Sequence, residues 1–225
     1  MPHYLDNIIW QAFVGPQARF TVGTDRIRRY APGLSPIIGA VDPARPDFGT
    51  LAPYCRPGEH FYCGGWRGTP PSGWKVEEES TMCRMAWAGP PSVADEAADA
   101  RPLGPQHAAS ALALAELTHP GPFGPRTLEL GDYFGFFEGE RLVAMAGERM
   151  HAGSYREISG VCTHPDFQGR GYARRLMSRL LHRQLARGEA PFLHVMSANT
   201  HARGLYERLG FRLHREVVVR VVAFG

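Results

Sequence analysis

The segment "HPDFQGRGYA", from His164 to Ala173, joins two stretches with different residue patterns. Residues 155–163 before it are rich in β-forming side chains and are followed by Pro165, so we expect a strand there. After Ala173, apolar residues recur at helical spacing up to Gly188, which predicts an amphipathic helix. Its apolar residues are Ala173, Leu176, Met177, Leu180, Leu181 and Leu185. The expected order is strand, glycine-bearing loop and helix.

The loop has the features of an anion site. The first turn of a helix carries backbone N–H groups without intrahelical partners, and the helix dipole adds partial positive charge there. Gly169 and Gly171 would let an anion approach the backbone closely. The segment therefore predicts either a tight turn or a cradle for a phosphate group.

The residue pattern separates three kinds of phosphate loop. A Walker loop needs a lysine followed by serine or threonine, and neither is present. A dinucleotide fingerprint begins well at Gly169 and Gly171, but Arg174 takes the place of its third glycine. A third pattern, Q-x-x-G-x-A, is met by Gln168, Gly171 and Ala173.

A second motif follows in "NTHARGLYERLGF", Asn199 to Phe211, whose apolar spacing predicts a helix ended by Gly210. Together the two motifs resemble the GNAT superfamily of acyl-coenzyme A dependent N-acyltransferases, over about residues 103–225. The resemblance implies a mixed, mostly antiparallel sheet flanked by helices, in the α/β (α+β) class. It also implies transfer of an acyl group, expected to be acetyl, from coenzyme A to an amine by direct attack, without a metal.

The resemblance also assigns the residues that would bind acyl-coenzyme A. Backbone groups of the loop would hold the pyrophosphate, while the preceding strand would pair with the pantetheine arm and polarise the thioester carbonyl. The residues concerned are Val161, Cys162, Thr163, Gln168, Gly169, Arg170, Gly171, Tyr172, Ala173, Arg174 and Asn199.

Two residues are the catalytic candidates. Tyr206 matches the tyrosine that often protonates the leaving thiolate in this superfamily; the alternative is a core residue on an apolar helical stripe. Glu157 opens the strand before the loop and would take the proton from the acceptor amine; the alternative is an exposed strand carboxylate. Asn199 fits either a helix N-cap or a contact to the pantetheine arm. We expect Cys162 to be a packed structural residue rather than an acyl-cysteine nucleophile.

The chain divides by composition. Residues 1–90 predict short α and β elements, which could form a degenerate half of the same fold and cover the acceptor side. Residues 91–102, rich in Pro, Ala and Asp, predict a linker, and residues 103–225 the acyl-coenzyme A domain. Nothing in residues 1–90 resembles the pyrophosphate loop, so we expect one active site per chain.

Composition limits the other function classes. No apolar run approaches the ~20 residues of a membrane helix, and the first residues lack a basic segment leading into an apolar one. We therefore expect a cytoplasmic protein that binds neither membrane nor nucleic acid; a homodimer is compatible with the sequence. Residues 101–225 hold 16 arginines against 11 acidic residues, so this part is the better host for an anion.

Two rival functions have distinct signatures. A non-catalytic acyl-coenzyme A sensor would keep the loop and lose turnover. An arginine-rich helical surface for nucleic acid would show binding that falls steeply with salt. The arginines after the loop, Arg174, Arg175, Arg179 and Arg183, are expected by default on a solvated helix face, where Arg174 could reach a phosphate.

Overall fold

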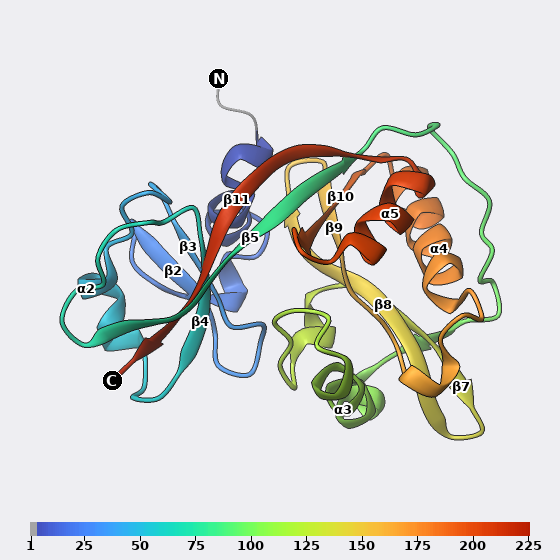
Figure 1. Cartoon of the computed structure of the whole chain (residues 1–225), viewed down its shortest axis with the longest axis horizontal. Coiled ribbons are helices and arrows are strands. Elements are labelled where there is room, and N and C mark those ends of the chain that lie inside the picture. Colours follow the sequence, from blue (N-terminus) through green and yellow to red (C-terminus); the bar gives the residue numbers. More distant parts are fainter. Residues whose placement is uncertain (1–3) are drawn as a thin grey trace.

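The computed structural model describes residues 4–225, and its strands join one eleven-stranded sheet in the order β1-β2-β3-β4-β11-β5-β10-β9-β8-β7-β6 (Figure 1). The strands are β1 Thr21–Gly23, β2 Ile27–Tyr30, β3 Ile37–Ala40, β4 His60–Gly64, β5 Trp74–Trp87, β6 Arg101–Leu103, β7 Tyr133–Glu138, β8 Arg141–Ala152, β9 Tyr155–Thr163, β10 Ala190–Met196 and β11 Phe211–Phe224. The mixed, mostly antiparallel sheet with flanking helices confirms the predicted fold class.

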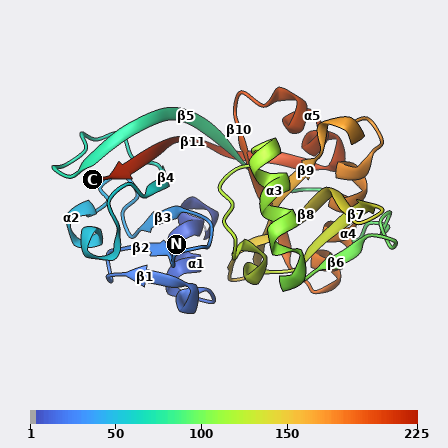
Figure 2. The same ribbon diagram turned by 90° about the horizontal axis from the view of Figure 1, so that it is seen from below.

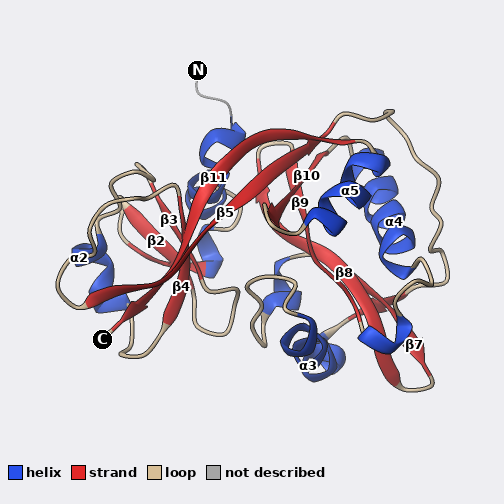
Figure 3. Cartoon of the chain, in the orientation of Figure 1, coloured by secondary structure: helices blue, strands red, loops and turns tan. Residues whose placement is uncertain are grey.

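The helices are unevenly distributed over this sheet. The α-helices are α1 Ile8–Val14, α2 Phe48–Leu51, α3 Ala108–Thr118, α4 Tyr172–Ala186 and α5 Thr200–Leu209. Short 3-10 turns occur at Tyr4–Asn7, Ala18–Phe20, Ala52–Tyr54, Pro105–His107, Thr127–Leu130 and Pro165–Phe167. Figure 3 shows the two helices α4 and α5 side by side on the C-terminal half, whereas α2 on the N-terminal half is only a short turn.

The sheet repeats one pattern from each of its ends toward the middle. Among the described strands, β3 with β4 and β9 with β10 are the two parallel pairs, and each is preceded by an antiparallel partner, β2 or β8. The two parallel pairs lie on either side of the central strands β11 and β5. The chain therefore contains two related halves, the N-half (β1–β4) and the C-half (β6–β10).

The strands β5 and β11 belong to both halves. They pair with each other from Phe211 opposite Trp87 to Phe224 opposite Trp74 and arch across the molecule (Figure 2). The second part of β11 pairs with β4, and the second part of β5 pairs with β10. Strand β11, which follows the parallel pair of the C-half in sequence, therefore pairs with the N-half. Strand β5, which follows the parallel pair of the N-half, pairs with the C-half.

Apolar packing also crosses between the halves. The side chains of Ile8 and Phe13 on α1 lie in one buried cluster with Met150 of β8 and Phe192 of β10. A separate aromatic cluster fills the N-half, and the apolar face of α4 fills the C-half. Burying these faces is the main stabilising contribution, at roughly 25 cal/mol for each Å² removed from water.

The predicted strand before the loop and the two predicted helices that flank β10 are confirmed. Two short strands, β2 and β6, are absent from the sequence prediction. Strand β6 contains Pro102, which argues against a strand, but β6 lies at the sheet edge where a missing N–H is tolerated.

The expectation of a solvated arginine face on α4 is wrong for Arg175 and Arg179, which are partly buried, whereas Arg174 is half exposed. Arg179 donates to Asp95 at 2.9 Å, Arg175 pairs with Asp99, and Arg174 pairs with Glu96. Arg179 also lies over the Phe134 ring at 4.4 Å. Residues 88–100 therefore run across α4 and are held there by ion pairs, because their acidic side chains match its arginines.

None of the helices within residues 4–225 combines the length and the apolar composition that crossing a bilayer would require.

Candidate active site

The sheet opens where β9 and β10 part. Their parallel pairing runs from Ala190 opposite Tyr155 to Phe192 opposite Glu157 and then ends. Beyond this point β9 stays paired with β8, through register shifts, while β10 stays paired with β5. The two strands therefore diverge with unpaired edges facing each other, which leaves main-chain groups available to an extended ligand.

A glycine shapes β9 at this opening. Gly160 has φ of +63°, and a Cβ there would meet the Tyr133 ring at 3.2 Å. Both the left-handed conformation and the contact select glycine. The resulting irregularity re-aims the residues after it, as β-bulges do, and brings Val161 to the opening.

The loop predicted to cradle a phosphate lies directly after β9. Gly169 and Gly171 have φ of +77° and +78°, and apart from the adjacent residues no atom lies within 4 Å of where a Cβ would be at either position. Gly171 is the N-cap of α4. Because the space beside both glycines is open and the first turn of α4 has unpaired N–H groups, the loop fits an anion such as a pyrophosphate.

Aromatic and basic side chains brace the ends of this loop. The Arg170 guanidinium lies 4.7 Å from the Phe167 ring centre, and the Tyr172 ring stacks on Phe136 at 4.8 Å. Arg174, predicted to reach a phosphate, pairs with Glu96, and both side chains are half exposed. Gln168 and Ala173 complete the loop and the first turn of the helix.

Cys162 has the character of a structural residue. It is buried beside Met145, and burial raises the pKa of its thiol to about 11. A thiol with such a pKa is protonated at neutral pH and is a poor nucleophile. Thr163, the next residue, ends β9 and is half-buried.

Tyr206 and Asn199 both line the opening from α5. The Asn199 side chain accepts a hydrogen bond from the Ala202 N–H at 3.0 Å, which confirms the predicted helix cap. Tyr206 packs its ring against Phe211 and forms no hydrogen bond within the part of the chain that the structure describes. Burial raises the pKa of Tyr206 to about 12, so its hydroxyl stays protonated at neutral pH and can donate.

Glu157 is fully buried, so the alternative of an exposed strand carboxylate is wrong. Arg149 Nε donates to its Oε2 at 2.9 Å and Arg149 Nη2 to its Oε1 at 2.7 Å, and His194 Nδ1 lies 2.7 Å from the same Oε1. Despite burial, the charge of Arg149 and these hydrogen bonds hold the pKa of Glu157 at about 2. As a proton acceptor at neutral pH this carboxylate is weak.

His194 extends the network toward the N-terminal segment. Its Nε2 accepts a hydrogen bond from Arg84 Nε at 2.9 Å, so the ring proton is on Nδ1 and is donated to Glu157. Burial lowers the pKa of His194, which keeps the ring neutral. Arg84 in turn donates to the main-chain oxygen of Leu5. The network therefore holds two guanidiniums and one carboxylate, a surplus of positive charge beside the opening.

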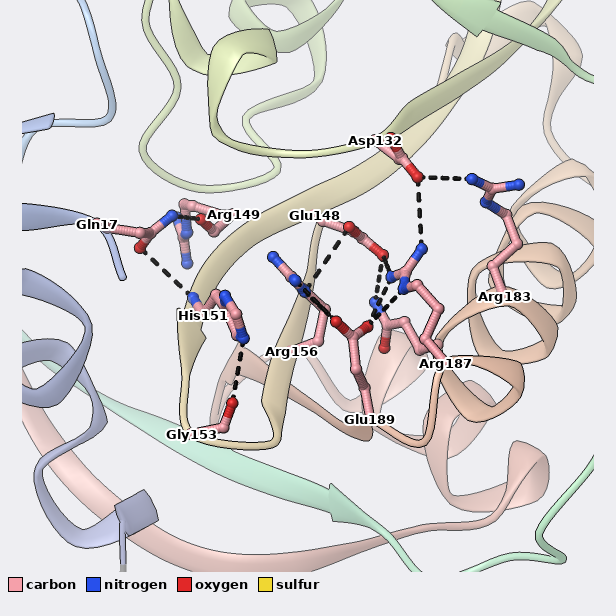
Figure 4. Close-up of polar contacts among 11 residues, drawn as sticks. Gln17, Asp132, Glu148, Arg149, His151, Gly153, Arg156, Arg183, Arg187 and Glu189 are labelled. Atoms are coloured by element: carbon pink, nitrogen blue, oxygen red, sulfur yellow. Dashed lines mark hydrogen bonds and ion pairs between the residues drawn. The ribbon is translucent and has the colours of Figure 1, made fainter. Parts of the chain in front are cut away.

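Sequence reasoning did not find Arg149 and His194 as site residues. The signal for Arg149 was present, because Glu148 and Arg149 interrupt an otherwise apolar strand and consecutive charges in such a strand require buried partners. Their side chains point to opposite faces of the sheet, as strand geometry dictates. Figure 4 shows Glu148 among the charged residues near α4, and Arg149 on the side of Gln17.

Gln17 joins the N-half to this region. Its Nε2 donates to the Arg149 carbonyl at 2.6 Å, its Oε1 accepts from the His151 N–H at 3.4 Å, and Tyr30 donates to the same Oε1 at 2.8 Å. Figure 4 shows this contact at the end of β8. The position of Arg149 is therefore fixed from both halves.

A cleft of about 310 Å³ brings these parts together. The C-half lines it with residues 158–161 of β9, the end of β10, Asn199, Tyr206 and Arg149. Strands β3 and β4 of the N-half line it as well, together with the shared strands β5 and β11. The loop 119–122 lies along the same cleft, so elements from both parts of the sheet meet in one space.

The class of protein follows from this geometry and from comparison with known proteins. An FR47-like family model matches residues 133–221, which span the opening, the loop and Tyr206. An acetyltransferase of Yersinia enterocolitica is 36% identical over 77 residues; the match covers 33% of this chain and 52% of that protein. The chain thus spans about half the length of that relative.

Solved structures extend the likeness to the whole chain. A protein of the GNAT family from Novosphingobium aromaticivorans is 33% identical, with all of both chains covered and a TM-score of 0.87. A GCN5-related N-acetyltransferase from Kribbella flavida shares the fold at 13% identity, with a TM-score of 0.60 and 97% and 95% of the two chains covered. The chain belongs to the GNAT superfamily.

Proposed function

We propose that this protein transfers an acetyl group from acetyl-coenzyme A to an amine by direct attack on the thioester. The observation that carries the proposal is the convergence, on one cleft, of the β9 irregularity, the parted edges of β9 and β10, and the protonated Tyr206 hydroxyl. The glycine loop and the start of α4 follow at the end of β9.

The donor would be held by main-chain groups. The N–H groups at Gly169 to Arg174 would bind the pyrophosphate, and the free edge of β9 from Val161 to Thr163 would pair with the pantetheine arm. Asn199, which already caps α5, would add a side-chain contact to that arm. A main-chain N–H near Val161 would polarise the thioester carbonyl and stabilise the oxyanion.

Tyr206 would donate a hydrogen bond to the departing sulfur. Because its pKa is raised to about 12, complete proton transfer to a thiolate is uphill, and stabilisation through the hydrogen bond is the expected contribution. The surplus positive charge of the Arg84, Arg149, Glu157 and His194 network favours the neutral amine over the ammonium. The same charge favours negative charge that develops on the thioester.

Glu157 enters this proposal as a positioning residue, in correction of the expected base. A buried carboxylate with a pKa of about 2, bound on both oxygens, cannot take a proton efficiently from an amine. It instead orients Arg149 and fixes the tautomer of His194 beside the cleft. The amine proton would leave through the open cleft to water.

The test is release of free thiol from acetyl-coenzyme A with a panel of primary amines. We expect Tyr206→Phe to lower kcat by about a hundredfold to a thousandfold, the range of one lost hydrogen-bond donor to developing negative charge. The dissociation constant for coenzyme A, measured by calorimetry, should stay unchanged. Tight coenzyme A binding without turnover of any amine would contradict the proposal and favour the sensor.

A further inference from the structure

The wall of the cleft on the side of the N-half contains an ionisable side chain that has no role in the proposed binding of acetyl-coenzyme A. Glu78 of β5 lines the cleft, and it is the one carboxylate among the described residues that do so. Within residues 4–225 it has no hydrogen bond and no ion pair, and it is exposed. An ionised carboxylate in a cleft favours a cation beside it.

The two neighbouring glutamates show that this is specific to one face of β5. Glu77 pairs with Lys75 at 2.8 Å and also contacts His60, while Glu79 accepts from Arg220 Nε at 2.6 Å. Alternation along the strand turns Glu77 and Glu79 to the other face. Of three consecutive carboxylates, the two outside the cleft are neutralised and the one inside is left unpaired.

The floor between Glu78 and the acyl-transfer end is mostly apolar. Register places Glu78 beside Val221 and Ser80 beside Val219, with Tyr62 and Gly64 on the next strand. Val219, Val221 and Met82 all line the cleft. Such a surface suits the carbon chain of a ligand and binds no second charge along it.

The spacing along β5 puts Glu78 away from the reacting centre. Met82 is paired with Met196, at the end of β10 where the sheet opens. The four residue steps from Glu78 to Met82 span about 13 Å at the rise of a strand. A cation bound at Glu78 is therefore not the amine that attacks the thioester, but a second group on the same molecule.

We propose, on the basis of the acetyl transfer proposed above, that the acceptor carries a second cationic group joined to the reacting amine by an apolar chain, and that Glu78 binds this group. The reacting amine lies next to the positive Arg149 and Arg84 network, which favours its neutral form. The distal cation lies over the N-half, where Glu78 supplies the opposite charge. The N-half thereby selects the acceptor.

Matched probes test this directly. Octylamine and the terminal diamine of octane differ only in the distal charge, and propylamine and the terminal diamine of propane provide a chain too short to reach Glu78. Rates of thiol release from acetyl-coenzyme A are measured for the four amines with wild type, Glu78→Gln and the control Glu77→Gln.

We expect wild type to favour the octane diamine over octylamine by about tenfold in kcat/KM, mainly through KM, as for one charge-assisted contact. Glu78→Gln should bring this ratio to about one, and Glu77→Gln should keep it. The propane pair should show no such preference. A preference that persists in Glu78→Gln, or its absence in wild type, would overturn the proposal.

A second measurement separates this inference from the proposed function. Calorimetric binding of the two octyl amines to protein saturated with coenzyme A needs no turnover. If wild type turns over no amine but still binds the diamine more tightly through Glu78, acetyl transfer fails and the cation site stands. If wild type and Glu78→Gln both bind the two octyl amines with equal affinity, the cation site fails, whatever the turnover.

Discussion

The two halves share a strand framework but differ in each part that would bind the donor. In β9 "ISGV" contains Gly160 with a left-handed backbone, whereas the matching "IIGA" of β3 keeps Gly39 in regular register with Arg28. The C-half connection to α4 contains two glycines; the N-half connection, residues 41–47, contains none and has Asp42 and Asp47. The framework supplies the opening, and local residues decide whether a phosphate is accepted.

The helices differ as strongly as the loops. Helix α4 has 15 residues, its counterpart α2 has 4, and residues 65–73 of the N-half contain no helix where the C-half has α5 with Tyr206. Trp66 and Trp74 pack with Phe48 and Phe61 inside the N-half. The N-half is filled by packed aromatic side chains, so we expect one coenzyme A per chain.

The largest expected effect is loss of coenzyme A binding in Gly171→Val. Valine is strained at φ of +78°, and its side chain would occupy the space needed by the phosphate. Gly58 of the N-half is a matched control, because it has φ of +83° and equally open surroundings. Both variants should lose about 1 to 3 kcal/mol of unfolding free energy. Calorimetry should show lost binding only for Gly171→Val; equal binding in both would mean that the loop is only a turn.

Glu157→Gln should destabilise the fold by about 3 to 5 kcal/mol, because it leaves the buried Arg149 charge without its partner. The N-half position that matches Glu157 is Pro36, which has no charge to pair. Urea unfolding measures the loss. Glu79→Gln, which breaks an ion pair whose carboxylate is exposed, should cost less than about 1 kcal/mol. Similar losses in the two variants would refute a special role for the buried pair.

Low pH should remove the contribution of the Glu157–Arg149 ion pair to the free energy of unfolding. The pKa of Glu157 is about 2 in the folded protein and near 4.5 in an unfolded chain, so its ion pair stabilises the fold above pH 4.5. That contribution should be lost as pH falls from about 4.5 to 2. Urea midpoints at pH 7, 4 and 2.5 should show the gap between wild type and Glu157→Gln narrowing. A constant gap would contradict the lowered pKa.

The smallest effect is expected at exposed arginines beside the two equivalent connections. Arg174 pairs with Glu96, and Arg45 of the N-half pairs with Asp42. Replacing either with alanine should change unfolding free energy by less than about 1 kcal/mol. Only Arg174→Ala should raise the KM for acetyl-coenzyme A. An unchanged KM would restrict Arg174 to holding residues 88–100 on the helix.

Local signals predicted the loop, the two helices after it and the Asn199 cap, because each of these depends on contiguous sequence. Glycines, a helix stripe and the Asn199 cap stand close together along the chain, and each has a short-range physical cause. The other residues around the cleft could not be predicted in this way. Glu78, Tyr62 and Arg149 meet only through pairing of strands far apart in sequence, and the burial of Glu157 depends on His194 and Arg84 from two other strands.

The pairing of β5 with the C-half and of β11 with the N-half also constrains how the chain can fold. Strand β4 has β11 as its inner neighbour, so the N-half keeps an open edge until residues 211–224 have been synthesised. Contacts between residues this distant in sequence slow folding, and exposed strand edges invite association with other chains. The nascent N-half therefore has a period of vulnerability that ends with the last strand. A cut within residues 91–102 would recreate it, since the N-terminal fragment lacks β11 and leaves β4 without its inner neighbour.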